Sequence, residues 1–223
     1  MFTSEGLEID NSEWEDQLEA AVGPPGYWAH QRDTQIKILN AFKIRSHHNV
    51  LEIGSGSMRC GSVFVKNLEP GRYTGAEVSP ERYALGKSML EHFGLMSRDP
   101  TLLCCDDFGV GDIPAGKMHL VWSFQVIPHF AETIFRNFIR AVGYHLRPRG
   151  KALFTVRLVE DGPPFSVRGK WLEFPTTNMR FDFIETLAGQ VGLKASQHGT
   201  LGEWGMDEKL GGAQNILVKL QQV

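Results

Sequence analysis

The residues best suited to chemistry lie in one glycine-rich turn, Glu52-Ile53-Gly54-Ser55-Gly56, which follows an apolar segment. Glycines let such a turn bring its backbone close to a ligand, and the unpaired amide groups at the start of a following helix point to the same place. A second acid, Glu77, ends the next apolar segment. A carboxylate there can accept both hydroxyl groups of a ribose. The pattern therefore predicts a turn that binds a nucleoside-containing ligand.

The charges of this turn bear on which ligand it binds. A dinucleotide fingerprint needs a third glycine where this chain has Arg59, a large cation that would disturb close packing of helix on strand. Glu52 would repel a pyrophosphate, whereas it suits a ligand with a positive amino group. S-adenosylmethionine has an ammonium, a sulfonium and a ribose, and no phosphate. A dehydrogenase that binds NAD in the same crevice remains the alternative.

Strand and helix patterns alternate along the chain around this turn. Ser79 followed by Pro80 is typical of a helix start. The alternation predicts an α/β fold, with a doubly wound, mostly parallel seven-stranded sheet, and a glycine-rich last connection predicts a hairpin that makes the last strand antiparallel. Strands are expected over 49–53, 72–78, 101–105, 118–122, 151–157, 194–199 and 215–220, and helices over 33–44, 62–68, 80–93, 134–142 and 181–191.

The length of 223 residues and the hydrophobic fraction of 42% fit one α/β domain with a buried core. We therefore expect a single domain over 1–223, with an α/β core over 47–223. The first twenty residues are acidic and carry few apolar positions. Residues 1–46 are predicted to form an N-terminal helical arm or lid.

Composition argues against several partners. The net charge is −3 and the basic residues are scattered, which disfavours nucleic acids and membrane surfaces. No apolar run approaches the roughly 18 residues of a membrane span, and the N-terminus does not resemble a secretory signal, so we expect a cytoplasmic protein. The three cysteines show no CxxC spacing and the histidines no metal motif, so neither a disulfide framework nor a metal site is expected.

Several segments, in order, resemble the class I S-adenosylmethionine-dependent methyltransferases. The segment 50–56 is similar to the first motif of that family, and 72–81 to the second, which holds the ribose-binding acid. The chain departs from the family at 57–60, Ser-Met-Arg-Cys, where many members have Thr-Gly and then a small or polar residue. Further similarities, within a matching region of roughly 50–156, lie at 105–108, 119–130 and 146–153.

The resemblance implies S-adenosylmethionine as the cofactor and gives roles to residues by position. Gly54 and Gly56 would approach its methionine part, Glu52 would orient the ammonium, and Glu77 would hold the ribose. Asp106 or Asp107 would accept a hydrogen bond from the adenine amino group, and the backbone of Ser123 and Phe124 would contact the amino-acid part. The predicted cofactor-binding set is Glu52, Gly54, Ser55, Gly56, Glu77, Val78, Asp106, Asp107, Ser123 and Phe124.

Methyl transfer from a sulfonium is an in-line displacement in which the protein mainly orients the reactants, so a general base is optional. His129, just after the fourth strand, is the best candidate base because ligands bind at the carboxyl edge of such sheets. His30 and Tyr27 would cover the cofactor if the N-terminal segment forms the lid that the resemblance implies. Apolar and aromatic residues in the loops 159–175 and 202–212, among them Trp171, Trp204 and Met206, would line a pocket for a small, partly apolar acceptor methylated on oxygen or nitrogen.

Two other functions compete with a small-molecule methyltransferase. An RNA or protein methyltransferase would be favoured by an Asn-Pro-Pro-Tyr-like run after the fourth strand, where this chain has Ser-Phe-Gln-Val at 123–126. A binding or scaffold protein with the same fold would be favoured by a decayed cofactor site. The intact acids and glycines of the turn argue against decay.

Overall fold

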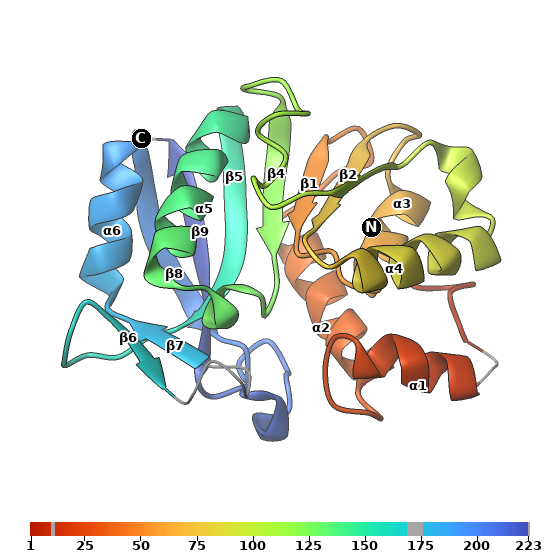
Figure 1. Ribbon diagram of the computed structural model, residues 1–223, viewed down its shortest axis with the longest axis horizontal. Coiled ribbons are helices and arrows are strands. Elements are labelled where there is room, and N and C mark those ends of the chain that lie inside the picture. The colour runs from red at the N-terminus through yellow and green to blue at the C-terminus, as the bar shows by residue number, and fades with distance from the viewer. Residues whose placement is uncertain (10–11, 169–175, 223) are drawn as a thin grey trace. The chain divides into compact units, whose positions relative to one another are not determined.

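A computed structural model describes residues 1–9, 12–168 and 176–222. The chain forms two compact units, Met1–Gly109 and Val110–Val223, and each is described by itself (Figure 1). The predicted fold class is confirmed: α/β, with a mostly parallel seven-stranded sheet whose last strand is antiparallel. None of the helices in the described residues is long and apolar enough to cross a membrane.

The first unit contains three parallel strands in the order β3-β2-β1. The central strand β2 (Tyr73–Glu77) pairs with β1 (Val50–Ile53) and with β3 (Thr101–Cys104). Parallel neighbours need crossover connections, and helices α3 (Gly61–Asn67) and α4 (Pro80–His92) provide them, with a short 3-10 turn at Leu95–Arg98 after α4. All four residues of β1 are buried, as a strand covered on both faces requires.

Helix α4 begins where the sequence predicts. The Ser79 hydroxyl accepts a hydrogen bond from the Arg82 amide at 3.3 Å, and Pro80 occupies the first turn. The helix ends at a cap residue, Phe93, followed by Gly94 in the left-handed region at φ 65°. This start holds the end of β2 in place, because Ser79 is only two residues beyond Glu77.

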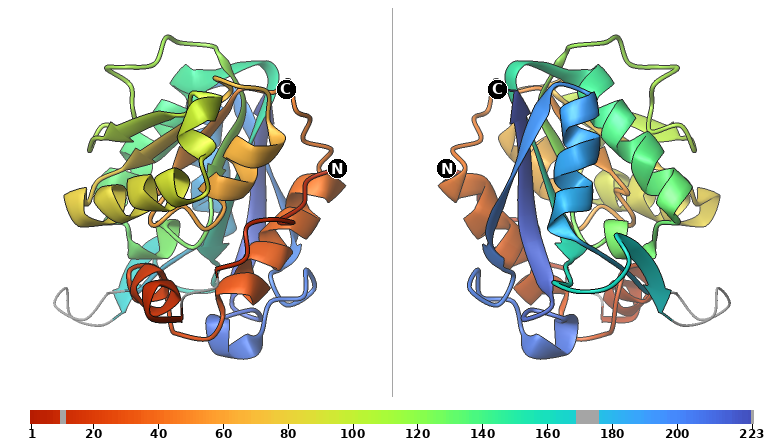
Figure 2. Two further views of the ribbon diagram at one scale, coloured as in Figure 1. Left: turned by 90° about the vertical axis from the view of Figure 1, so that its right-hand side faces the viewer. Right: turned by 90° about the vertical axis from the view of Figure 1, so that its left-hand side faces the viewer.

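The N-terminal residues are packed rather than loose. Phe2, Leu7 and Leu18 are buried despite the polar composition around them. The first nine residues run beside α2 (Trp28–Ala41), and the Arg32 side chain of α2 donates to the Leu7 carbonyl at 2.7 Å (Figure 2). A further helix, α1 (Ser12–Ala20), was not among the predicted elements. Whether residues 1–46 act as an arm or lid of one domain remains a prediction.

The second unit holds four strands in the order β4-β5-β9-β8. β4 (Met118–Ser123) and β5 (Leu146–Arg157) are parallel, and β9 (Asn215–Gln222) is antiparallel to both β5 and β8 (Leu193–Thr200), which confirms the predicted hairpin. Helices α5 (Glu132–His145) and α6 (Phe181–Gln190) lie side by side (Figures 1 and 2). The core side chains of this unit include Phe135, Phe138 and Phe154.

Two features of the second unit differ from the predictions. β5 begins at Leu146 rather than at residue 151. β6 (Phe165–Arg168), inside the expected loop 159–175, pairs antiparallel with β7 (Thr176–Met179), a stretch for which no element was predicted. The polar serines and threonines of these short strands, next to a Pro-Pro pair, hide the alternation that marks a strand. The 3-10 turns Ile127–His129 and Glu208–Leu210 complete the unit. Trp171, predicted to line the acceptor loop, lies outside the described residues.

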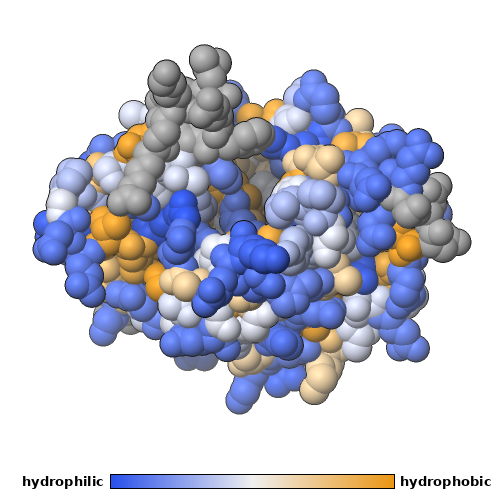
Figure 3. Space-filling view, turned by 90° about the horizontal axis from the view of Figure 1, so that it is seen from below, coloured by the Kyte–Doolittle hydropathy of each residue, from blue (hydrophilic) through white to orange (hydrophobic). Residues whose placement is uncertain are grey.

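The surface drawn in Figure 3 is mostly hydrophilic. Its hydrophobic side chains occur in small separate groups (Figure 3). Scattered apolar side chains are normal on a folded protein surface. This face therefore gives no argument for an extended apolar interface.

Candidate functional site

The glycine-rich turn takes a backbone path that requires glycine. Gly54 and Gly56 have φ values of 74° and 55°, in the left-handed region where a side chain is strained. The Gly54 amide donates to the Ala76 carbonyl of β2 at 2.8 Å. The turn is thereby held over the carboxyl ends of β1 and β2, where ligands bind in open α/β sheets.

The Gly56 position is also closely covered. A β-carbon built on Gly56 would lie 2.6 Å from a methyl group of Val22. Glycine is therefore required there both by its φ and by the approach of the N-terminal segment. The segment touches the turn in a second place, because the Ser57 hydroxyl donates to the Leu18 carbonyl at 2.8 Å.

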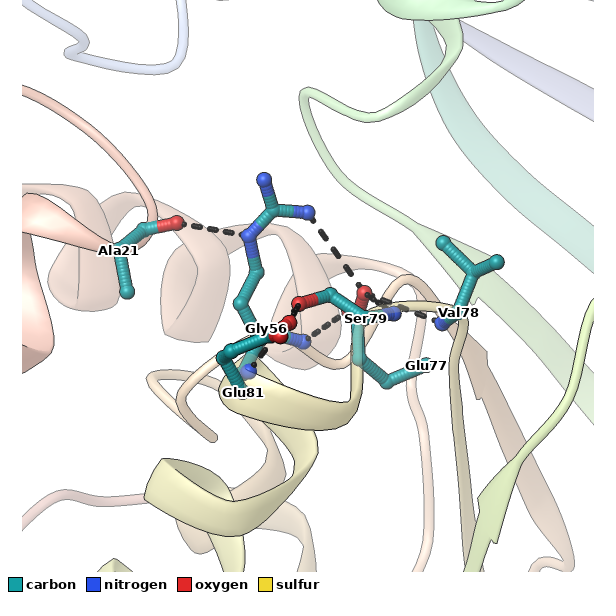
Figure 4. Close-up of polar contacts among 7 residues, drawn as sticks. Ala21, Gly56, Glu77, Val78, Ser79 and Glu81 are labelled. Carbon is teal, nitrogen blue, oxygen red and sulfur yellow. Dashed lines mark hydrogen bonds and ion pairs between the residues drawn. The ribbon is translucent and has the colours of Figure 1, made fainter.

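Glu77 is the best-anchored acid of the site. Its side chain is 4% exposed, and one carboxyl oxygen accepts from the Gly56 amide at 2.8 Å (Figure 4). The other oxygen accepts from the amides of Val78 at 3.1 Å and Ser79 at 3.0 Å, and lies 3.6 Å from the Arg82 guanidinium. The end of β2 and the glycine-rich turn are thus joined through one carboxyl group, at the position predicted to hold a ribose.

Glu52 has a different environment. It is buried, and its Oε2 accepts from the Tyr73 hydroxyl at 2.6 Å. Burial raises the pKa of Glu52 to about 8, although the Tyr73 hydrogen bond and the Arg59 charge both act to lower it. Glu52 is therefore mostly protonated at neutral pH in this structure. The sequence did not indicate Tyr73, because nothing in the strand pattern shows that its hydroxyl reaches the neighbouring strand.

A short stretch of the N-terminal segment, 18–27, forms a wall beside the turn. The Glu19 carboxyl group accepts from the amides of Gly26 and Tyr27, which folds this stretch back on itself. The Arg82 side chain donates to the Ala21 carbonyl at 3.0 Å (Figure 4). Tyr27 is half-buried and its ring meets that of His30, which is exposed, at 6.4 Å between centroids. Tyr27 thus ends this stretch as the N-cap residue of α2, and His30 lies in the first turn of that helix.

The two acids after β3 are exposed and differ in their hydrogen bonds. The Asp107 side chain accepts from the Gly109 amide at 2.9 Å, which makes a local turn. The Cys105 amide donates to the Glu77 carbonyl at 3.0 Å, so the end of β3 lies beside the ribose-binding candidate. The Asp107 carboxyl group is thus already engaged in the Gly109 turn, whereas among the described residues no such turn contact is seen for the exposed Asp106.

The second unit carries the candidates Ser123, Phe124 and His129. Ser123 and Phe124 are buried at the end of β4, and the Phe124 ring stacks on Trp122 at 5.6 Å between centroids. The next residue, Gln125, has a φ of 56°, and its backbone amide donates to the Thr155 hydroxyl at 2.7 Å, which fixes the turn after the strand. His129 ends a 3-10 turn and is exposed.

The loop after β8 is organised by its own contacts. Met206, one of the residues expected to line an acceptor pocket, is buried, and the Trp204 indole donates to the His198 carbonyl at 2.8 Å. The Leu210 carbonyl accepts from the Gln125 side chain at 2.9 Å. This loop is thus tied to the turn that follows β4, where the carboxyl-edge candidates of the unit lie.

Within the described residues, no group of three or more His, Cys, Asp or Glu side chains is arranged to hold a metal ion. Cys60 is buried, and burial raises the pKa of its thiol well above the ordinary value. The chemistry of the site in the first unit therefore rests on carboxyl groups, backbone amides and arginine.

Comparisons with known proteins agree on the fold. No protein-family model matches the chain, and no curated protein matches its sequence. Among solved structures, the glycopeptide N-methyltransferase MtfA in complex with S-adenosylmethionine superposes with a TM-score of 0.65 at 15% identity, over 86% of this chain and 94% of MtfA. MtfA has also been solved with sinefungin and with S-adenosylhomocysteine.

Two further structures broaden the comparison. The mitomycin 7-O-methyltransferase MmcR has a TM-score of 0.62 at 15% identity, over 89% of this chain and 55% of MmcR. The [4+2]-cyclase SpnF has a TM-score of 0.63 at 15% identity, over 85% of this chain and 81% of SpnF. The chain therefore has the class I methyltransferase fold. At this identity the fold does not fix the reaction.

Proposed function

We propose that this chain is an S-adenosylmethionine-dependent methyltransferase that acts on a small-molecule acceptor. The observation that carries the proposal is the buried Glu77 carboxyl group, bonded to the Gly56 amide at the carboxyl end of β2. A carboxyl group fixed there is suited to accept the two hydroxyls of a ribose. The fold shared with MtfA, which has been crystallised with this cofactor, supports the same assignment.

The residues of the turn fit this cofactor better than a dinucleotide. The third glycine of a dinucleotide fingerprint is replaced by Arg59. Gly54 and Gly56 take left-handed φ values, and a turn of this kind is suited to approach the methionine part. NAD is therefore the weaker candidate, and the binding experiment below includes it.

The remaining site residues take the roles that their positions suggest. Bound S-adenosylmethionine would supply a methyl group on a positively charged sulfur. Glu52 would face the ammonium, and Asp106 would accept from the adenine amino group. The backbone of Ser123 and Phe124 would contact the amino-acid part.

The candidate general bases for the acceptor are two exposed histidines and a half-buried tyrosine. His129 ends a 3-10 turn after β4, exposed to solvent, where it could take a proton from a hydroxyl acceptor. His30 and Tyr27 are the alternatives on the N-terminal segment. An amine acceptor would need no base, and replacing His129 would then leave the rate nearly unchanged. The structural neighbours include both an N- and an O-methyltransferase, so both acceptor types belong in the screen.

Binding calorimetry tests the cofactor. Wild-type protein is expected to bind S-adenosylhomocysteine and not NAD, and Glu77→Gln should weaken that binding by at least about tenfold, since it removes the charged acceptor of the ribose. Glu69→Gln, at an exposed acid of the same unit, is the matched control and should bind like wild type. Binding of NAD but not of S-adenosylhomocysteine would contradict the proposal and favour an NAD-dependent dehydrogenase instead.

An acceptor screen tests the reaction. Purified protein with S-adenosylmethionine is incubated with a metabolite extract, and mass spectrometry looks for compounds that gain the mass of one methylene. Cofactor binding without any methylated product, from small molecules or from added RNA and protein, would contradict the proposal. Such a result would favour a non-methylating role on this fold, as the cyclase SpnF illustrates.

A further inference from the structure

The positive charges of the second unit are concentrated in one stretch of its sequence. Residues 113–159 contain seven lysines and arginines and one acid, Glu132, although the whole chain has a net charge of −3. Glu132 pairs with Arg136 one turn further along α5, at 2.6 Å. The stretch therefore has an excess of positive charge, carried by the remaining cations Lys117, Arg140, Arg147, Arg149, Lys151 and Arg157.

Four of these cations, defined here as the basic edge, lie where β4 and β5 begin: Lys117, Arg147, Arg149 and Lys151. The two strands are parallel, so they start at the same edge of the unit, and α5 ends there as well (Figure 1). The Gly116 amide donates to the Tyr144 carbonyl at 2.9 Å, which joins the last turn of α5 to the residue before Lys117. The fold thus gathers cations that composition alone describes as scattered.

A bulge at the start of β5 presents the two arginines. β4 and β5 pair as Met118 with Leu146 and next as Leu120 with Lys151, so a single residue of β4 faces residues 147–150 of β5. All three residues 147–149 are exposed. A bulge of this kind turns side chains away from the regular ladder. The two arginine side chains of the bulge therefore belong to the surface of the unit.

The backbone of the bulge is held in one form at a cost. A β-carbon on Gly150 would lie 2.7 Å from the Met118 carbonyl oxygen and 2.9 Å from that of Arg147, so glycine is required to close the bulge. Arg149 has a φ of 64°, in the left-handed region that arginine rarely adopts. Glycine would be less strained there, so an arginine at this position indicates that its side chain is used.

Arg147 is oriented by a neutral group. Its Nη1 lies 2.5 Å from His119 Nε2, and since a guanidinium can only donate, the imidazole nitrogen accepts. In the part of the chain that the structure describes, neither Arg147 nor Arg149 forms an ion pair. Further along β5, burial and the charge of Lys219 lower the pKa of Lys151. Both arginines are therefore charged, exposed and available to an anionic partner.

The chemistry of the basic edge suits carboxylates. A guanidinium binds a carboxylate through two parallel hydrogen bonds. Tyr144, 39% exposed in the last turn of α5, adds an aromatic side chain of the kind that protein interfaces favour. A nucleic acid fits less well, because this longer polyanion would also meet the rest of the chain, where acids outnumber lysines and arginines. We propose that the basic edge binds an acidic segment of another protein, whose carboxylates pair with Arg147 and Arg149.

This surface is separate from the candidate site residues of the same unit. Ser123 ends β4 and His129 follows it, whereas the basic edge lies at the start of that strand. A partner bound at the amino edge would leave the carboxyl edge open to an acceptor. The proposal thus goes beyond the proposed function and does not depend on it.

Fluorescence anisotropy with a labelled oligoglutamate peptide and the full chain tests the partner chemistry. We expect binding at about 50 mM salt that weakens about three- to tenfold at about 200 mM, because charge pairs at a surface are screened. Arg147→Gln combined with Arg149→Gly should weaken binding at least about tenfold, since both guanidinium forks are lost. Arg72→Gln combined with Arg180→Gln is the matched control: it removes two exposed arginines paired with their own acids, and should bind like wild type.

Arg149→Gly alone separates binding from folding. Glycine adopts a φ of 64° without strain, so the melting temperature should equal or exceed that of wild type while peptide binding falls about three- to tenfold. The proposal is overturned by wild type that does not bind the peptide at low salt, or by arginine variants that bind it unchanged. Tighter binding of a single-stranded RNA of the same length than of the peptide would also overturn it, in favour of a nucleic-acid surface.

Discussion

Glu52 and Glu77 are buried at the same turn, but they are bonded to different groups. Three backbone amides donate to Glu77, which fixes its carboxyl group at the carboxyl end of β2. Glu52 accepts from the Tyr73 phenol inside the unit, where burial favours the protonated carboxyl. Two residues of one type, predicted from two successive motifs, therefore differ in what they contribute: Glu77 orders the backbone of the turn, and Glu52, with its raised pKa, is expected to titrate.

Glu52 should make stability depend on pH. Its folded-state pKa of about 8 lies above the ordinary 4.5, so between these values the folded protein holds a proton that the unfolded chain has released. The contribution of the protonated Glu52 to the free energy of unfolding is fully present below the unfolded-state pKa, and it is lost as the pH rises toward 8. The free energy of unfolding of Glu52→Gln, relative to that of wild type, should therefore be about 2 to 3 kcal/mol higher at pH 7.5 than at pH 5.5. Urea denaturation at about these two pH values measures the difference.

Tyr73→Phe provides the companion measurement for this pH effect. It removes the hydrogen bond that lowers the Glu52 pKa, so the loss of stability should extend to higher pH than in wild type. A stability difference between wild type and Glu52→Gln that does not change with pH would show that Glu52 does not titrate in this range.

At the scale of elements, helix α4 supports the turn by close packing. A β-carbon on Gly86 would lie 2.8 Å from the Gly56 carbonyl and 2.8 Å from Met58 Cγ. A backbone carbonyl cannot swing aside as the end of a flexible side chain can. The N-cap at Ser79 and the glycine at position 86 therefore act together: one places the start of the helix at the end of β2, and the other lets the helix body approach the turn.

Two glycine-to-alanine variants test this packing. Gly86→Ala should destabilise the protein by about 1–3 kcal/mol through overpacking, and should also weaken binding of S-adenosylhomocysteine. Gly189→Ala in α6 is the matched control: nothing lies within 4 Å of the added carbon, so alanine should stabilise the helix by about 0.5–1 kcal/mol. Denaturant midpoints measure both. Shifts in the same direction would contradict the close packing of α4 on the turn.

At the scale of the whole molecule, cofactor binding should be coupled to folding. The turn, the wall of residues 18–27 and α4 make up the site in the first unit, and Leu18 of the wall is fully buried. A ligand that binds only this folded arrangement should stabilise it by about 2.7 kcal/mol at 100 times its dissociation constant. Thermal denaturation with S-adenosylhomocysteine measures the effect, with NAD at the same concentration as the control. A melting temperature that does not respond to S-adenosylhomocysteine would argue against the proposed site.

The sequence alone determined the features that depend on neighbouring residues. The Ser79-Pro80 helix start, the alternation of strands and helices, and the antiparallel last strand all follow from local patterns and short connections. It also placed Gly54, Gly56 and Glu77 together, because the carboxyl ends of adjacent parallel strands meet at one edge. The β6–β7 hairpin was missed, since its polar residues weaken the alternating signal.

Only the tertiary structure decided what packs on those residues. The contact of Val22 with Gly56, the bond from Tyr73 to Glu52, and the burial of Phe2 and Leu18 link positions far apart in the chain. No local period encodes such pairs, because they arise when separate apolar faces are buried together. Burial in turn determines the electrostatics of the site, because it raises the pKa of Glu52 and lowers that of Arg59.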